Sequence, residues 1–217
     1  MISYYADRAQ EYERIYHKPE RQDDLRWLRG FVEQTFAGKH VLEIACGTGF
    51  WTEVLSRSAA SVTATDINEE VLKIARTKPL DTQKVCFQRA DAYALPAFAG
   101  QFTGGLAVFW WSHIPKARLR NFLVNLHRVF KPGSVMVFID NVYVEGSSTP
   151  ISHADTEGNA FQRRKLDDGS THDVLKNFPT EQELRDTVTT LASDVRIEFL
   201  RYYWTLTYIP KLDGIPT

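Results

Sequence analysis

The fold can be inferred from one segment, Val41-Leu42-Glu43-Ile44-Ala45-Cys46-Gly47-Thr48-Gly49-Phe50-Trp51-Thr52. It begins as a run of β-forming residues, breaks into a turn of small residues, and continues with a pattern that suits a helix. A strand that enters a glycine turn at a helix N-terminus presents backbone N–H groups to a polar ligand. Gly47 and Gly49 would let that ligand approach the backbone closely. A tight turn also needs glycine for steric reasons alone, so the stretch by itself predicts only a strand, a turn and a helix.

The chain after this stretch alternates between short apolar runs and segments with helical spacing. We expect strands at about 41–45, 61–65, 84–89, 105–109 and 134–139, separated by helices at 51–57, 69–76 and 116–130. Lys131-Pro132-Gly133 is expected to be the turn before the last of these strands. Such alternation is typical of a parallel sheet with right-handed crossovers and helices on both faces. Ligands of these α/β sheets bind beyond the carboxyl ends of the strands.

The remaining segments belong to what we expect to be a single domain over residues 1–217. Residues 1–38 contain two predicted helices, at 3–16 and 20–36, which would form a lid over a cofactor-binding core at 39–140. Residues 141–179 break the α/β rhythm and are expected to be a substrate-side excursion with a hairpin at Asp168-Gly169. Residues 180–217 should form a closing helix and two strands, with Thr180 and Glu183 as a capping box.

Composition excludes several classes of protein. The 26 basic and 27 acidic residues give a net charge of −1, so no nucleic-acid or membrane partner is expected. Two cysteines do not indicate a disulfide framework. The N-terminal segment lacks the apolar core of a secretory signal, and the longest apolar runs are too short to span a bilayer. We expect a soluble cytoplasmic protein, a monomer or homodimer, whose partner is a small molecule.

Two acidic residues stand at the predicted strand ends. Asp66 ends the second strand, and Asp91-Ala92 follows the third. One carboxylate can accept from both hydroxyls of a ribose, and Asp66 is placed to do so. Asp91 and the Ala92 amide suit a purine's exocyclic amine and ring nitrogen, with Ile67 as an apolar face. The ligand is expected to be an adenosine derivative. The sequence motif that binds nicotinamide dinucleotides requires a third glycine. Here the corresponding segment, Gly47-Thr48-Gly49-Phe50-Trp51-Thr52, ends in threonine instead.

These motifs together resemble the class I S-adenosylmethionine-dependent methyltransferases, specifically the small-molecule group. The resemblance is carried by Val-Leu-Glu-Ile-Ala-Cys-Gly-Thr-Gly, Ala-Thr-Asp-Ile-Asn, Arg-Ala-Asp-Ala and Arg-Val-Phe-Lys-Pro-Gly, in that order. It implies a Rossmann-like, seven-stranded, mostly parallel sheet whose last strand is antiparallel. It also implies S-adenosylmethionine as cofactor and S-adenosylhomocysteine as product. Ala45 stands where many members have glycine, and Phe102-Thr103-Gly104-Gly105 replaces a more usual Phe-Asp-Ala.

The resemblance assigns cofactor contacts to individual residues: Glu43, Ala45, Gly47, Gly49, Trp51, Asp66, Ile67, Asp91, Ala92 and Phe109. The first four would line the methionine end, Asp66 would hold the ribose hydroxyls, and Phe109 would lie near the sulfonium. Ile67, Asp91 and Ala92 would frame the adenine.

Methyl transfer to an oxygen or nitrogen of a small molecule requires mainly alignment, plus a base where the acceptor is not already anionic. His113 follows the fourth strand and would be that base, or else it fixes the loop. Trp110 would form an aromatic wall for the substrate, and Tyr5 and Tyr12 would contact the substrate from the lid. A nicotinamide-dependent oxidoreductase and a non-catalytic S-adenosylmethionine-binding module remain the alternatives.

The segment from Arg163 to Phe178 resembles natural-product O-methyltransferases that esterify phosphonates. In those enzymes a lysine near this point helps to bind the anionic substrate, and Lys176 is the match. The alternative is that the basic residues here form a solvated face paired with nearby aspartates. No metal is expected: catechol-type enzymes share the Asp140-Asn141 feature but need an acid where this chain has Trp110-Trp111.

Overall fold

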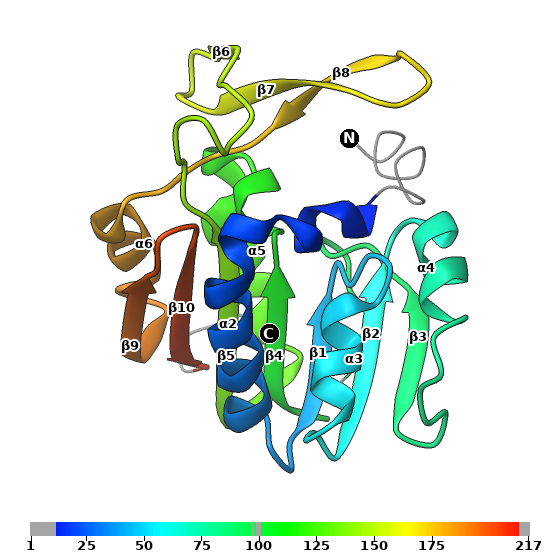
Figure 1. Cartoon of the computed structure of the whole chain (residues 1–217). Helices are drawn as coiled ribbons and strands as arrows, with labels where there is room; N and C mark the ends of the chain where they lie inside the picture. The colour runs from blue at the N-terminus through cyan, green and yellow to red at the C-terminus, as the bar shows by residue number, and fades with distance from the viewer. Residues whose placement is uncertain (1–11, 97, 99–100, 213–217) are drawn as a thin grey trace.

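The computed structural model describes residues 12–96, 98 and 101–212, and its centre is a seven-stranded sheet (Figure 1). The strands are β1 (His40–Ile44), β2 (Ser61–Asp66), β3 (Val85–Arg89), β4 (Phe102–Val108), β5 (Phe130–Asn141), β9 (Ala192–Phe199) and β10 (Tyr203–Pro210). Their order is β3-β2-β1-β4-β5-β10-β9. β1 to β5 pair in parallel, and β10 runs antiparallel to both β5 and β9. The predicted Rossmann-like sheet with an antiparallel last strand is confirmed.

Helices cover both faces of the sheet because each carries one apolar side. On one face lie α2 (Gln22–Thr35), α3 (Phe50–Ser56) and α4 (Glu69–Ala75); on the other lie α5 (Lys116–His127) and α6 (Glu181–Val188). Each face has its own buried cluster, with Leu28 and Leu55 in one and Leu123 and Leu184 in the other. The capping box of α6 forms as expected, since Thr180 Oγ1 accepts from the Glu183 N–H.

The N-terminal segment differs from the expected pair of lid helices. The predicted helix at 3–16 lies largely outside the described residues; what is described is a short 3₁₀ helix η1 (Tyr12–His17), followed by η2 (Pro19–Arg21). Tyr16 of η1 packs over the end of β4, with its ring centroid 5.8 Å from that of Phe109. The second predicted helix, α2, packs along the face of the sheet instead, because its apolar side is completely buried there.

The predicted turn at Lys131-Pro132-Gly133 is wrong: these residues lie inside β5. β4 starts earlier than expected, so Phe102 already pairs with Phe130, and the register then shifts to Gly104 opposite Val135. The extra β5 residues form a bulge, which tolerates a proline because an unpaired residue needs no N–H. The predicted helix at 116–130 correspondingly ends at His127.

The 141–179 excursion folds into a second sheet above the carboxyl ends of the main strands (Figure 1). It consists of β6 (His153–Ala154), β7 (Ala160–Lys165) and β8 (Thr171–Leu175) in antiparallel order. The hairpin expected at Asp168-Gly169 joins β7 to β8. β6, which the sequence did not indicate, pairs with β7 through His153 and Ala154.

A buried histidine under the main sheet makes stability depend on pH. His127 is completely buried, with Nε2 2.8 Å from the Tyr208 hydroxyl, and burial lowers its pKa to about 4. In the unfolded chain the same histidine takes up its proton near pH 6.5. Between pH 6.5 and 4 the unfolded state therefore binds more protons than the folded state, and the free energy of unfolding falls as the pH drops through that range. We expect the free energy of unfolding to be about 2 kcal/mol lower at pH 5 than at pH 7.5 from this group.

Urea unfolding at the two pH values measures this difference. His127→Gln should make the difference smaller by about that amount, whereas His40→Gln, at an exposed position, should leave it unchanged. An unchanged pH dependence in a folded His127→Gln variant would contradict the assignment.

Candidate functional site

A cavity of about 540 Å³ lies at the carboxyl ends of the parallel strands. Seven of the residues predicted to contact a cofactor line it: Ala45, Gly47, Asp66, Ile67, Asp91, Ala92 and Phe109. They come together because β3, β2, β1 and β4 are neighbours in this order and parallel, so that the loops that follow them share one edge. We call this the cofactor-side cavity.

Asp66 organises the glycine turn as well as facing the cavity. Its carboxylate accepts from the Gly47 N–H at 3.0 Å and from the Asn68 N–H at 2.9 Å. Burial raises the pKa of Asp66, while these backbone donors act in the opposite direction. Each carboxylate oxygen has a second lone pair, so the group keeps acceptor capacity for two vicinal hydroxyls. These acceptor oxygens therefore fit the vicinal hydroxyls of the ribose of an adenosine cofactor.

Three predicted cofactor residues lie outside the described lining of this cavity. Glu43 is buried beneath it and accepts from Thr52 Oγ1 at 2.6 Å; burial raises its pKa to about 8. Trp51 points into the hydrophobic core, with its ring against Tyr16 and Phe50. Gly49 has φ +81°, and a Cβ there would lie 3.1 Å from the Ala75 Cβ, so packing of α3 against α4 requires this glycine.

Two residues of the cavity wall adopt left-handed backbone conformations. Ala45 has φ 54° and Phe109 has φ 58°. Such conformations are unusual for residues with a Cβ, most of all for a bulky one, and they cluster at functional sites. At Phe109 the turn directs the chain away from β4 at the point where the cavity ends.

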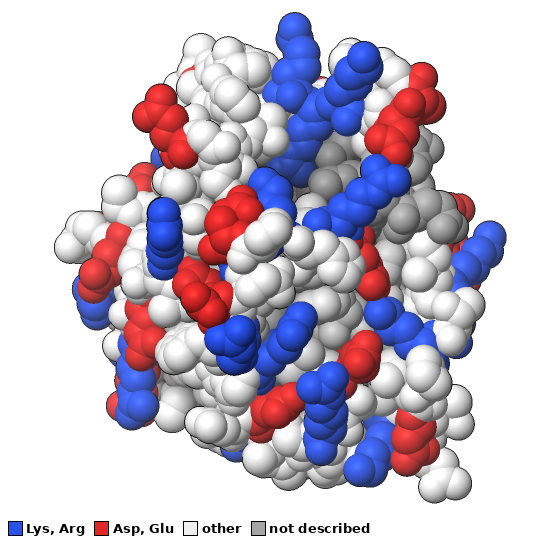
Figure 2. Space-filling view, in the orientation of Figure 1, with Lys and Arg blue, Asp and Glu red and all other residues white. Residues whose placement is uncertain are grey.

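A second cavity of about 310 Å³, the basic pocket, adjoins the first. Its described lining contains six cationic side chains and no acidic one: Lys18, Arg21, Arg163, Arg164, Lys165 and Lys176. Figure 2 shows Lys and Arg side chains gathered at the top of the molecule, above the ends of the strands. Phe109 and His113 line both cavities. The basic pocket is thus connected to the cofactor-side cavity at these two residues.

His113 is buried, and its orientation is set by the second sheet. Nδ1 lies 2.6 Å from the carbonyl oxygen of Leu175 in β8, so Nδ1 carries the proton and donates. In the neutral ring Nε2 is then the basic nitrogen. A histidine held in this tautomer, at the junction of two cavities, is suited to accept a proton.

Lys176 is part of a buried ion pair. Its Nζ donates to Asp140 Oδ1 and to Ser112 Oγ, each at 2.7 Å, and the two charged residues are 3% and 0% exposed. Burial lowers the pKa of Lys176 to about 8, although the charge of Asp140 acts against this shift. Only one of the three ammonium donors remains for a ligand. The charge that was predicted to bind an anion is largely balanced by Asp140.

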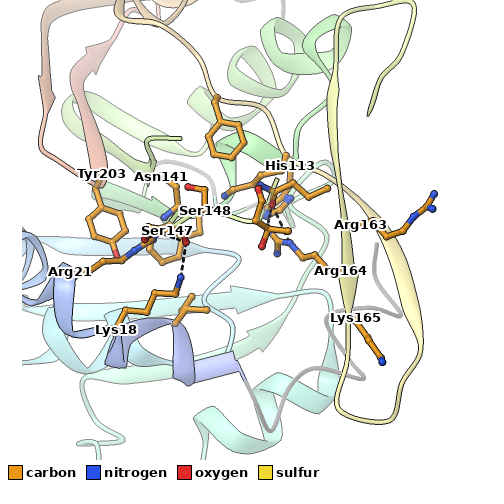
Figure 3. A pocket seen from close by; sticks show the side chains of 16 residues that line it. Lys18, Arg21, His113, Asn141, Ser147, Ser148, Arg163, Arg164, Lys165 and Tyr203 are labelled. Atoms are coloured by element: carbon orange, nitrogen blue, oxygen red, sulfur yellow. Dashed lines mark hydrogen bonds between the residues drawn. The ribbon is translucent and has the colours of Figure 1, made fainter. Parts of the chain in front are cut away.

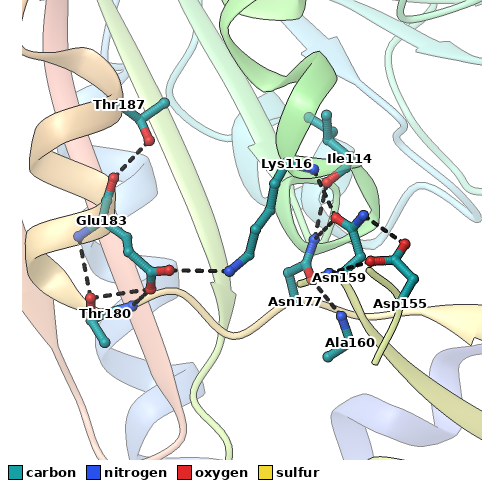
Figure 4. A network of polar contacts seen from close by, with 9 residues as sticks. All are labelled: Ile114, Lys116, Asp155, Asn159, Ala160, Asn177, Thr180, Glu183 and Thr187. Carbon is teal, nitrogen blue, oxygen red and sulfur yellow. Dashed lines mark hydrogen bonds and ion pairs between the residues drawn. The ribbon is translucent and has the colours of Figure 1, made fainter. Parts of the chain in front are cut away.

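A polar network around Asn159 and Asn177 connects the second sheet to the segment that follows β4 (Figure 4). Asn177 donates through its backbone N–H to the Ser112 carbonyl and through Nδ2 to the Ile114 carbonyl. Asn159 accepts from the Lys116 N–H at 2.8 Å. Both asparagines are buried, so replacing either would leave unpaired polar groups.

Of the other predicted substrate residues, the structure describes the side chain of Trp110 alone, and Trp110 is not in the lining of the basic pocket. Trp110 lines the cofactor-side cavity and packs against Tyr93, because it precedes the short helix at 111–113 that turns the chain toward α5. Tyr5 lies outside the described residues, as does the side chain of Tyr12. Arg163 forms an exposed pair with Asp173, as the solvated-face alternative anticipated.

Two pocket residues were missed by the sequence analysis, Lys18 and Arg21. The signal was present as His17-Lys18-Pro19-Glu20-Arg21, a basic segment interrupted by proline directly before a helix. Nothing in this pattern indicated that the segment faces residues 126 positions away along the chain.

Two features are absent from the residues that the structure describes. These residues contain no group of three or more His, Cys, Asp or Glu side chains able to hold a metal ion. None of their helices combines the length and apolar character needed to cross a bilayer.

The fold and the cofactor-side cavity define an α/β protein that binds an adenosine-containing cofactor. Residues 41–133 match the family model described as a methyltransferase domain. The chain belongs to the class I S-adenosylmethionine-dependent methyltransferases.

Individual relatives agree with this assignment. An O-methyltransferase of Pyrenophora dematioidea is 30% identical over 152 residues, covering 68% of this chain and 55% of the relative. A demethylmenaquinone methyltransferase of Tropheryma whipplei (strain Twist) is 30% identical over 131 residues, covering 59% and 54%. The chain thus spans about half the length of these curated relatives. Among solved structures, the DhpI–SAM–HEP complex is 27% identical to this chain with a TM-score of 0.79, and the match covers 96% of this chain and 95% of that one. The DhpI–SAH complex is 28% identical with a TM-score of 0.77, and the match covers 96% of this chain and 94% of that one.

Asp66→Ala tests the ribose contact. We expect it to weaken binding of S-adenosylhomocysteine by about 1.5–3 kcal/mol, or about 10–150-fold, the usual range for hydrogen bonds to a charged group. Calorimetric titration measures the affinity, and thermal unfolding shows whether the glycine turn survives. Asp66→Asn keeps one oxygen acceptor and should lose less, and Asp23→Ala on the exposed side of α2 should lose nothing. Wild-type affinity in a folded Asp66→Ala protein would remove Asp66 from the site.

Proposed function

We propose that this protein transfers a methyl group from S-adenosylmethionine to an oxygen atom of a small anionic acceptor. One observation carries the proposal: a pocket with six cationic and no acidic side chains in its described lining opens onto the cofactor-side cavity at Phe109 and His113. An acceptor held in the basic pocket would meet the methyl donor at these two residues. Oxygen is favoured over nitrogen because the Pyrenophora relative is an O-methyltransferase.

The cofactor supplies an electrophilic methyl group, so the residues of this chain mainly bind and align. Asp66 would hold the ribose, with Ile67, Asp91 and Ala92 around the adenine. Phe109, held in a strained backbone conformation, would form the wall between the two cavities.

His113 would contact the acceptor at the junction of the cavities. Nε2 can accept the proton of an acceptor hydroxyl as the oxygen attacks, or orient an oxygen that is already ionised. The cations of the basic pocket would orient the acceptor and balance its charge. A phosphonate is one such acceptor, in line with the resemblance of the segment from Arg163 to Phe178 to O-methyltransferases that esterify phosphonates.

The two alternative functions fit the site less well. A nicotinamide-dependent oxidoreductase would need room for a pyrophosphate at the glycine turn, where Asp66 already accepts from the Gly47 N–H. A non-catalytic binding module has no need for a second pocket beside the cofactor, and this pocket measures about 310 Å³.

Two measurements test the proposal. Calorimetry should show binding of S-adenosylhomocysteine and none of NAD; the reverse result would overturn the assignment. A screen with methyl-labelled S-adenosylmethionine over acidic, phenolic and phosphonate compounds should then find label on the oxygen of an anionic acceptor. Transfer to neutral phenols with no transfer to acids or phosphonates would contradict the anionic-acceptor part alone.

A further inference from the structure

Lys18 and Arg21 form a distinct group of cations on one side of the basic pocket. In Figure 3 they lie together with Ser147 and Tyr203, whereas His113 and Arg164 lie on the other side of the pocket. Lys18 Nζ donates to the Ser147 carbonyl at 2.8 Å, and Arg21 Nη2 donates to Ser147 Oγ at 3.0 Å and to its carbonyl at 3.4 Å. Both side chains are therefore held in place by the same loop residue.

Neither cation forms a direct ion pair in the part of the chain that the structure describes. Their hydrogen bonds go to a neutral carbonyl and a neutral hydroxyl, and neither side chain is in an ion pair. The nearby Glu20 carboxylate instead accepts from Ser147 Oγ at 2.9 Å. The other buried cation of the pocket, Lys176, is paired with Asp140. Lys18 and Arg21 thus differ from Lys176 in lacking a direct ion pair, although the charge of Glu20 acts on both.

Arg21 is placed as an anion-binding residue would be. It is 7% exposed, and its buried Nε has no hydrogen-bond partner among the described residues. Its guanidinium lies 5.2 Å from the ring centroid of Tyr202 and 5.7 Å from that of Tyr203, which restrict the orientation of the fork. A buried guanidinium without a carboxylate is costly unless a ligand supplies the negative charge. Burial and the charge of Arg21 also lower the pKa of Lys18.

The reacting end of the pocket is marked by the residues that it shares with the cofactor-side cavity. The ring centroids of Phe109 and Tyr203 are 5.7 Å apart, and Lys176 Nζ lies 5.9 Å from the ring centroid of Phe109. Only Phe109 and His113 among the described lining residues also border the cofactor-side cavity. The oxygen that receives the methyl group must therefore lie near His113, away from Lys18 and Arg21.

We propose that Lys18 and Arg21 form a subsite for a second anionic group of the acceptor, located at the opposite end from the oxygen that is methylated. The acceptor is then a small diacid. Its reacting end lies near His113, and its distal acid is bound by the guanidinium fork and the ammonium group. This inference rests on the proposed function. It means that Lys18 and Arg21 make the protein bind diacids more tightly than monoacids.

Matched pairs of phosphonates test the subsite on the protein loaded with S-adenosylhomocysteine. Phosphonoacetate is compared with ethylphosphonate, and 3-phosphonopropionate with propylphosphonate, so that each pair differs by a carboxylate in place of a methyl group. Calorimetry should show at least one diacid binding about tenfold or more tightly than its alkyl partner, the scale of charge-assisted hydrogen bonds. Arg21→Gln and Lys18→Met should each reduce this preference severalfold.

Controls separate the subsite from the rest of the site. Arg26→Gln, an exposed arginine of α2, should keep the preference, and all variants should keep the affinity for S-adenosylhomocysteine. Lys18→Met provides an independent variant if Arg21→Gln, whose side chain packs on two tyrosines, does not fold. Equal binding within both pairs, or a preference that survives in both folded variants, would overturn the subsite while leaving the anionic acceptor intact. Binding of S-adenosylhomocysteine with no binding of any phosphonate would overturn the subsite. If the methyl-transfer screen then also found no acidic compound that is methylated, the proposal of an anionic acceptor would be overturned too.

Discussion

Replacing Lys176 by methionine should lower the free energy of unfolding by about 3–5 kcal/mol, the loss expected when one partner of a buried ion pair is removed. The variant leaves the Asp140 carboxylate, which is completely buried, with only the N–H groups of Ser112 and Asn141 as donors. Methionine fills most of the lysine's volume, so the loss reports on the uncompensated charge and not on a cavity. Urea unfolding at neutral pH measures the difference.

A double variant shows whether the loss comes from the pair. Asp140→Asn combined with Lys176→Met removes both charges and should recover a large part of the stability, giving a coupling energy of about 2 kcal/mol or more. Lys165→Met, at an exposed position of the same sheet, should change stability by less than about 0.5 kcal/mol. A loss of under about 1 kcal/mol in Lys176→Met, the scale of an exposed pair, would contradict the structural role.

This role also changes how substrate affinity in Lys176 variants should be interpreted. The Lys176→Ala test that the sequence suggests would disturb Ser112 and Asp140, so weaker acceptor binding would not identify a direct contact. Unchanged acceptor affinity in a folded variant would still exclude a direct contact between Lys176 and the acceptor. Arg21 and Lys18 are the better probes of anion binding, because their side chains donate to Ser147 and neither forms an ion pair among the described residues.

His113→Asn should lower the rate of methyl transfer by about 10²–10⁴-fold for an acceptor whose oxygen carries a proton at the assay pH, the usual contribution of a general base. Asparagine can still donate to the Leu175 carbonyl that now anchors Nδ1, but it offers no basic nitrogen in place of Nε2. Single-turnover transfer of labelled methyl to the acceptor found in the screen measures the chemical step. Affinity for S-adenosylhomocysteine should stay within about twofold.

The dependence on pH distinguishes a base from a residue that only fixes the loop. Raising the pH until the acceptor oxygen ionises by itself should restore most of the rate in His113→Asn, because no proton then has to be removed. The loss in a merely structural variant would persist at every pH. His40→Asn, an exposed histidine at the amino end of β1, serves as the control and should retain the wild-type rate.

Much of the cofactor side could be predicted because its signals are local. Asp66 and Asp91 each follow a strand that the apolar pattern reveals, and parallel strands bring such positions to one edge whatever the details of packing. Gly49 and Trp51 belong to the same turn but face Ala75 and the core, so the cofactor contacts expected of them stay predictions. Whether a residue of a motif faces the ligand or the neighbouring helix depends on side-chain direction, which sequence spacing does not determine.

The acceptor side could be predicted only in part. The basic residues of the 141–179 excursion and its hairpin were visible, but which of them keeps an unbalanced charge was not. Arg163 is paired with Asp173 across the hairpin, and Lys176 with Asp140 at the end of β5. Lys176 and Asp140 are 36 positions apart in the sequence, and Arg21 and Ser147, which are hydrogen-bonded, are 126 positions apart.

The sequence by itself determined the class of fold, the glycine turn and the acidic strand ends, since these follow from periodicity and from the geometry of parallel sheets. Three features became visible only in the folded structure: Lys18 and Arg21 face the pocket, Lys176 is paired with Asp140, and Nε2 is the basic nitrogen of His113. The physical reason is that the effective charge and protonation of a side chain depend on burial and on partners brought together by folding. The turn from Val41 to Thr52 therefore predicts the methyl donor, and contacts between distant segments decide how the acceptor is bound.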